Sequence, residues 1–205
     1  YTMSVSQGVA NATQFMKLLN TEQYLAMRNE AFANDGFAPS FMDFDVNGTW
    51  DPNRYTDWQA ALVGGTATYK DANASVSGGS AQTQFMVSGT FHDETTVFPG
   101  DFGYKRGVLR SNLNHASESQ KFRLSLSTAY TVQDNDQPAV DLSRTAMILA
   151  PNAPALYNDD GSLNWAGSTW ENPLAALAGK YRTKTYDVIA NGTIGYMLLP
   201  GVELN

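Results

Sequence analysis

The chain contains no cysteine, only two histidines and few basic residues, and each shortage excludes a class of protein. Without cysteine, its 205 residues form no disulfide bond, thiolate zinc site or cysteine nucleophile. The two histidines, His92 and His115, are too few for a histidine-rich metal site. Thirteen basic residues against twenty acidic ones give a net charge of −7, with no basic cluster suited to nucleic acid. No apolar run exceeds five residues, whereas a membrane-spanning helix needs ~20.

The most regular feature that is present is a strict alternation of apolar and polar residues. From Phe122 to Val132 the apolar side chains fall on one face of a predicted strand and the polar ones on the other. The same pattern predicts strands over 83–92, 104–114 and 186–198, and shorter candidates are 1–9, 73–77 and 202–205. We expect the strands 83–92, 104–114 and 121–132 to pair consecutively and antiparallel, with 104–114 in the centre.

Short and long connections alternate along the chain. Short turns are predicted at Gly78-Gly79, at 114–120 and at Pro200-Gly201, and long excursions cover about 10–72, 93–103 and 134–180. The pattern predicts an all-β antiparallel up-and-down meander with short helices in its long loops, the turns lying at one end and the loops at the other. Transmembrane β-barrels have this asymmetry, and strands of ~9–11 residues favour them. A soluble extracellular β-sandwich that binds carbohydrate is the alternative.

Two helices are expected inside the long loops. Asn20 is a predicted N-cap, with Gln23 completing a capping box, and Gly36 is the predicted stop. A weaker helical pattern covers 141–149 and is ended by Pro151.

Several short motifs follow one another along nearly the whole chain. They are Leu19-Asn20-Thr21-Glu22-Gln23-Tyr24, Arg28-Asn29-Glu30-Ala31, Tyr55-Thr56-Asp57-Trp58-Gln59, Asn73-Ala74-Ser75-Val76-Ser77-Gly78-Gly79-Ser80, Phe91-His92-Asp93-Glu94, Lys105-Arg106 with Arg110-Ser111-Asn112-Leu113, Asn172-Pro173-Leu174 and Leu199-Pro200-Gly201-Val202-Glu203-Leu204. In this order they resemble motifs of the SusC-like (SusC/RagA-type) TonB-dependent outer-membrane transporters.

The resemblance implies the early strands of a transmembrane β-barrel in the cell outer membrane that imports a nutrient, glycan or peptide. It implies a SusD-like surface lipoprotein, the TonB complex and outer-membrane lipid as partners. Residues 1–205 would be a partial barrel segment, with the plug domain, the TonB-binding part and the remaining barrel absent. Both ends fall within alternating runs, so we expect an excised segment. In such a barrel Leu126 and its apolar neighbours would face outward, and Arg123, Ser125 and Ser127 the lumen.

Aromatic residues in the two longest loops are the candidate contacts for a ligand or for the lipoprotein lid. Their rings can stack on sugars or contact a partner protein. The alternative is that they form small cores that hold the loops together, which we expect for two or more of the tryptophans. The candidates are Trp50, Tyr55, Trp58, Trp165 and Trp170.

One acidic motif resembles part of a calcium loop, but no residues suggest catalysis. Asp43, Asp45, Asn47 and Asp51 match the early ligand positions, whereas Arg54 stands where the last ligand should be a glutamate. An ordinary turn is therefore favoured over calcium binding. Neighbouring loop acids do not make the facing pair that glycoside hydrolysis requires. We expect no enzyme activity, no cofactor and no tightly bound transition metal.

Overall fold

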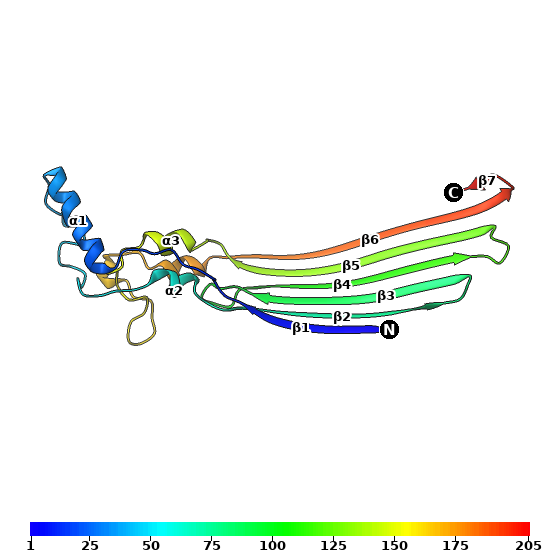
Figure 1. The fold of residues 1–205 in the computed structure, drawn as a ribbon, viewed down its shortest axis with the longest axis horizontal. Helices are drawn as coiled ribbons and strands as arrows, with labels where there is room; N and C mark the ends of the chain where they lie inside the picture. The colour runs from blue at the N-terminus through cyan, green and yellow to red at the C-terminus, as the bar shows by residue number, and fades with distance from the viewer.

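The computed structural model describes all 205 residues and places them in one long sheet with a smaller helical part at one end (Figure 1). The sheet has seven antiparallel strands in sequence order, so the predicted all-β up-and-down meander is confirmed, and it is not closed into a barrel. The strands are β1 (Thr2–Ala10), β2 (Ala67–Gly79), β3 (Thr83–Thr95), β4 (Gly103–Ala116), β5 (Phe122–Pro138), β6 (Lys180–Leu199) and β7 (Val202–Leu204).

The pairing of the central strands follows the predicted order. Leu113 of β4 lies opposite Phe85 of β3 and Leu126 of β5, so β4 is central among these three strands as expected. Residues that are directly opposite one another share a face of the sheet. The register therefore decides which face every side chain occupies.

Several strands are longer than the alternation predicts. β5 continues beyond Val132 to Pro138, and β6 begins at Lys180 rather than at Tyr186. These extensions carry polar residues on both faces, so they show no alternation, although their backbones stay paired. Nζ of Lys184 and a carboxylate oxygen of Asp134 lie 3.5 Å apart across this part of the sheet.

The short turns and the long loops lie at opposite ends, as predicted. The β2–β3, β4–β5 and β6–β7 turns are at one end in Figure 1, whereas the long connections gather at the other. Gly201 in the last turn has φ 88°, a conformation that glycine adopts without strain. We call the three long connections (residues 11–66, 96–102 and 139–179) the head.

The head contains the helices. α1 (Thr21–Asp35) begins with the predicted capping box of Asn20 and Gln23 and ends at Gly36. The weaker predicted helix is present as α3 (Ser143–Ile148), and α2 (Trp58–Val63), which was not predicted, starts where Asp57 caps the amide of Ala60. Two short 3₁₀ helices cover Ala166–Ser168 and Pro173–Ala178. None of these helices combines the length and the apolar composition that a membrane-spanning helix requires.

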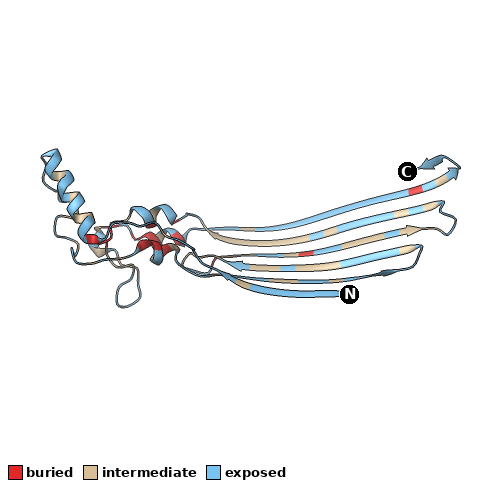
Figure 2. Cartoon of the chain, viewed as in Figure 1, coloured by how far each residue is buried: buried red, intermediate tan, exposed pale blue.

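The only hydrophobic core lies in the head (Figure 2). Within the strands, Val108 and Gly195 alone are buried, and no second sheet covers either face. The sheet therefore lacks a core of its own. The core residues are Trp58, Leu62, Phe102, Leu142, Ala146, Ala153, Trp170, Leu174 and Leu177.

Candidate functional site

One face of the sheet, called the apolar face here, carries most of the large apolar side chains of the strands. The exposed fractions are 40% for Leu126, 73% for Val188 and 60% for Ile194, because no part of the chain packs over them. Large exposed apolar patches are characteristic of surfaces that contact another protein or a membrane. This face includes Val5, Phe85, Phe91, Leu109, Leu113, Phe122, Leu124, Leu126, Tyr130, Val188 and Ile194.

A row of alternating charges bounds the apolar face on the side of the head. The register aligns Lys70, Asp93, Lys105, Asp134 and Lys184 on five neighbouring strands. From this row to the turns, the apolar face has no lysine, arginine, aspartate or glutamate. On β5 the apolar stretch from Phe122 to Val132 has the length of roughly 9–11 residues with which a tilted strand spans a bilayer.

The opposite face, called the polar face here, carries hydroxyl, amide and charged groups. Ser125, Ser127 and Arg123 of β5 lie on it, and Thr193 and Asn191 of β6 stand opposite the two serines. Its apolar exceptions include Met86, Val108, Ile189 and Met197. The sequence therefore assigned the residues of β5 correctly to two faces of different chemistry.

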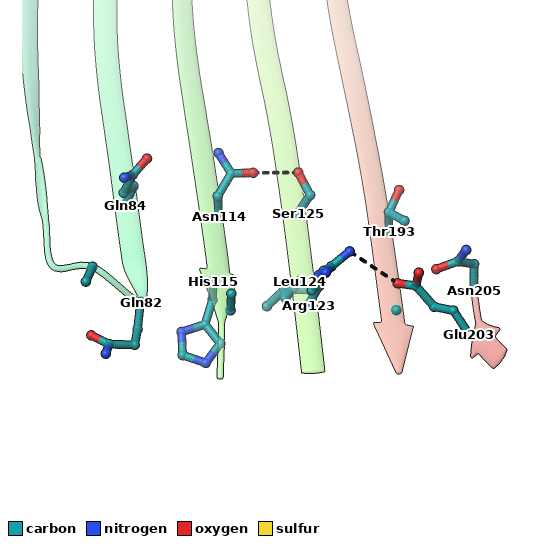
Figure 3. Close-up of a pocket in the computed structure, with 13 residues that line it drawn as sticks. Gln82, Gln84, Asn114, His115, Arg123, Leu124, Ser125, Thr193, Glu203 and Asn205 are labelled. Carbon is teal, nitrogen blue, oxygen red and sulfur yellow. Dashed lines mark hydrogen bonds and ion pairs between the residues drawn. The ribbon is translucent and has the colours of Figure 1, made fainter. Parts of the chain in front are cut away.

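A hollow of about 440 Å³ lies on the polar face near the turns (Figure 3). Gln84, Asn114, Ser125 and Thr193 line it from one register row that crosses four strands. The Ser125 hydroxyl donates a hydrogen bond of 2.7 Å to the side-chain carbonyl of Asn114. At the rim a guanidinium nitrogen of Arg123 lies 3.7 Å from a carboxylate oxygen of Glu203; Figure 3 marks this ion pair with a dashed line. The amide and hydroxyl groups of this lining can bind polar groups of a ligand.

A second polar group, not anticipated from the sequence, crosses the polar face close to the head. One ring nitrogen of His92 is 2.7 Å from Asp71, and the other is 3.2 Å from Glu94. The Tyr104 hydroxyl donates to the side-chain carbonyl of Gln133 at 3.1 Å. The signal for this group is the register, which places Asp71 opposite His92, and pairing register cannot be read from one strand alone.

Two of the five aromatic candidates hold the head together. The rings of Trp58 and Trp170 are 5.9 Å apart, and their exposed fractions are 3% and 9%. Nε1 of Trp58 donates to the Ala150 carbonyl at 2.8 Å, and Nε1 of Trp170 donates to the Asn164 carbonyl at 2.9 Å. These side chains join the two longest loops, which is the structural role expected for at least two tryptophans. They offer little surface to a ligand.

The other aromatic candidates are more accessible. Trp165 is 46% exposed and Tyr55 is 59% exposed. Tyr55 also borders an apolar hollow of about 250 Å³ with Leu19 and Ile148. Trp50 is half-buried and donates from Nε1 to the Thr169 hydroxyl at 3.0 Å. Contact of these three with a ligand or lid stays a prediction.

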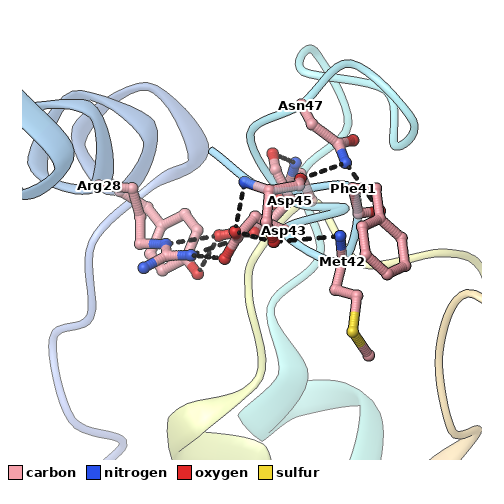
Figure 4. Close-up of polar contacts among 9 residues, drawn as sticks. Arg28, Phe41, Met42, Asp43, Asp45 and Asn47 are labelled. Carbon is pink, nitrogen blue, oxygen red and sulfur yellow. Dashed lines mark hydrogen bonds and ion pairs between the residues drawn. The ribbon is translucent and has the colours of Figure 1, made fainter. Parts of the chain in front are cut away.

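The motif that resembles a calcium loop is occupied by an arginine (Figure 4). Arg28 of α1 lies 3.1 Å from Asp43 and 2.7 Å from Asp45, so its guanidinium compensates both carboxylates. Asn47 donates its side-chain amide to two backbone carbonyls, and Asp51 accepts the amide of Asn53. No group of three or more acidic or histidine side chains is arranged to hold a metal ion. The acidic motif is thus explained by an ion pair with the helix.

The same ion pair has a tyrosine partner that links α1 to the loop. The Tyr24 hydroxyl donates to Asp45 at 2.8 Å; burial, followed by this hydrogen bond, raises the pKa of Tyr24 to about 12. Burial alone would raise the pKa of Asp45, but hydrogen bonds from Arg28 and Tyr24 outweigh it and lower the pKa. Tyr24 and Arg28 are four residues apart and therefore share one face of the helix. This spacing is the sequence feature that could have indicated a common partner for the two side chains.

Comparisons with protein-family models and with curated protein sequences find no match to this chain.

Proposed function

We propose that this chain is the leading barrel segment of a SusC-like TonB-dependent transporter that carries a glycan or peptide across the cell outer membrane. Transport in this proposal involves no covalent chemistry. The observation that carries it is the uncovered sheet, with one face apolar and uncharged between the charged row and the turns, and the other face polar. The choice of family in this proposal rests on the sequence motifs, which occur in the order found in SusC-like transporters.

The physical argument starts from the apolar face. Apolar surface is stable only when it is removed from water, and no second sheet or helix in the chain removes it. In a transmembrane barrel, alternate residues of each strand contact lipid and lumen. Lipid contact on one face and water or a plug on the other therefore accounts for both faces together.

The inclined turn end of the sheet also supports a barrel. Measured from the charged row, β2 ends at Gly79, nine residues after Lys70, whereas β6 ends at Leu199, fifteen residues after Lys184. From β2 to β6 the turn end is therefore displaced along the strands by about six residues, or roughly 20 Å. Over four strand spacings of about 4.8 Å each, this displacement inclines the turn end by about 45°. Barrel strands are tilted by about 35–45°, so turns inclined in this way would lie level with the membrane.

The proposal requires further strands and partners. The outer edges of β1 and of most of β6 have unpaired backbone groups, which additional strands would pair. The head would face outward, where Tyr55 and Trp165 are available to a ligand or to a SusD-like lipoprotein. The TonB complex would act through a part of the protein outside residues 1–205. A β-sandwich would need a second sheet over the apolar face, and the chain forms one sheet.

A matched pair of substitutions in the full-length protein tests this function. Leu126→Arg puts a guanidinium on the apolar face, where lipid contact would cost about 2–4 kcal/mol at mid-depth. Ser125→Arg puts the same group on the adjacent polar position and should leave assembly intact. Folding into lipid vesicles is scored by heat-modifiable gel mobility, together with outer-membrane fractionation of the cells. Equal assembly of the two variants would contradict the proposal.

A further inference from the structure

Two arginines in the centre of the polar face lack an acidic partner. The sheet contains four arginines, of which Arg123 pairs with Glu203 at 3.7 Å and Arg182 pairs with Asp134 at 3.6 Å. Arg106 and Arg110 of β4 form no ion pair, although both are exposed. Acidic residues outnumber basic ones in the chain, so a shortage of acids does not explain it.

On the adjoining strands β3 and β5 the neighbours of Arg110 include hydroxyl groups but no carboxylate, and Asp187, opposite Thr131, lies one strand further away on β6. Arg110 lies opposite Ser88 and Ala129, and the diagonal polar-face positions are Met86 and the hydroxyl residues Thr90, Ser127 and Thr131. Their hydroxyl groups can donate hydrogen bonds to an anion and can also bind hydroxyl groups of a ligand.

The acids nearest Arg106 are already engaged. Arg106 lies opposite His92 and Gln133. Asp71 and Glu94 both contact the ring of His92, at 2.7 and 3.2 Å. Arg106 therefore has an amide on one side and an engaged histidine on the other, and its guanidinium is left available.

The spacing of the two arginines suits an extended ligand. Residues four apart on a strand share a face and are separated by about 13 Å. A guanidinium binds a carboxylate through two parallel hydrogen bonds, which makes arginine selective for this group. Repeated carboxylates on a hydroxyl-rich chain match two arginines set among serine and threonine hydroxyls, and such a chain is a uronic-acid oligosaccharide.

We propose that Arg106 and Arg110 form a binding strip for the carboxylates of a uronic-acid oligosaccharide on the polar face. This inference rests on the proposed function, since it narrows the transported nutrient to an acidic glycan passing along the barrel wall. The strip also gives the path a local positive charge within a chain whose net charge is negative.

Calorimetric titration of the full-length protein in detergent tests the strip. The probes are hexamers of galacturonic acid and of mannuronic acid, the uncharged galactose hexamer and hexaglutamate. We expect at least one uronate to bind at least tenfold more tightly than the galactose hexamer. Arg110→Gln and Arg106→Gln should each weaken uronate binding about tenfold, because each removes a charge-assisted contact. Arg110→Lys should recover part of the loss.

The matched control is Arg182→Gln, which removes an equal charge outside the polar face and should change uronate binding less than twofold. The strip is refuted if neither uronate binds more tightly than galactose, if Arg182→Gln weakens binding as much as Arg110→Gln, or if hexaglutamate binds as tightly as the uronates. Heat-modifiable mobility of the same samples separates the two proposals. If the protein forms a barrel but does not prefer uronates, only the binding strip is refuted. If it binds uronates selectively but forms no barrel, the strip is supported and the transporter proposal is refuted.

Discussion

The head and the sheet contain similar apolar side chains but expose them very differently. Leu62 of the head is fully buried, whereas Val188 of the sheet is 73% exposed. Burying such a side chain contributes about 1.5–3 kcal/mol, which the head gains within this chain and the sheet does not. The head thus has a hydrophobic core of its own, whereas the sheet leaves its apolar face uncovered.

The head should be most sensitive at its central tryptophan. Trp58→Ala removes a buried ring that contacts Trp170, and such truncations cost about 3–5 kcal/mol. Hydrogen exchange of α2 and α3 in the full-length protein measures the loss as a lower free energy of local opening. Exchange of β4 should not change.

Trp165→Ala is the control, because Trp165 is 46% exposed and lies outside the core cluster. Its effect on head stability should stay below about 1 kcal/mol. If both substitutions opened β4 as much as the head, the two regions would be one cooperative unit and the comparison would fail.

The link between α1 and the rest of the head should depend on pH, with a smaller effect of about 1 kcal/mol. The pKa of Asp45 lies below its usual 3.8 in the folded head, so its contribution is present above pH 4 and is lost as pH falls through the lowered pKa. The pKa of Tyr24 is raised to about 12, so its contribution is present below pH 10 and is lost as pH rises toward 12.

A spin label on Ala31→Cys reports this link, since Ala31 is an exposed α1 residue in a chain without cysteine. We expect label mobility to be lowest at neutral pH and to rise at both extremes. Asp45→Asn should increase mobility at neutral pH and remove the acid transition. An acid transition that persists in Asp45→Asn would assign it to another group.

The strands could be predicted from sequence where their two faces differ in chemistry. The alternation from Phe122 to Val132 marks β5 because one face of the strand is apolar and the other is polar. Beyond Val132 both faces are polar, so the extension to Pro138 left no periodic signal. The helix from Thr21 was predictable because its capping groups are local.

The interior of the head could not be predicted in the same way. Trp58 and Trp170 are far apart in sequence, and their contact depends on how two long loops fold onto each other. The ion pair of Arg28 with Asp45 likewise joins a helix to a loop whose path has no periodic pattern. Four tryptophans in loops suggested either ligand contacts or a core, and only the structure separates buried Trp58 and Trp170 from exposed Trp165.

The central claim is that the two faces of the sheet meet different media, and the accessibility of spin labels tests it most directly. Labels are placed at Leu126→Cys and Val188→Cys on the apolar face and at Ser127→Cys and Asn191→Cys on the polar face, with the full-length protein in lipid vesicles. Apolar-face labels should collide readily with oxygen, which concentrates in lipid, and rarely with a water-soluble nickel complex. Polar-face labels should not show this lipid pattern. Equal access of the nickel complex to both faces, or shielding of Leu126 from both reagents, would contradict the account.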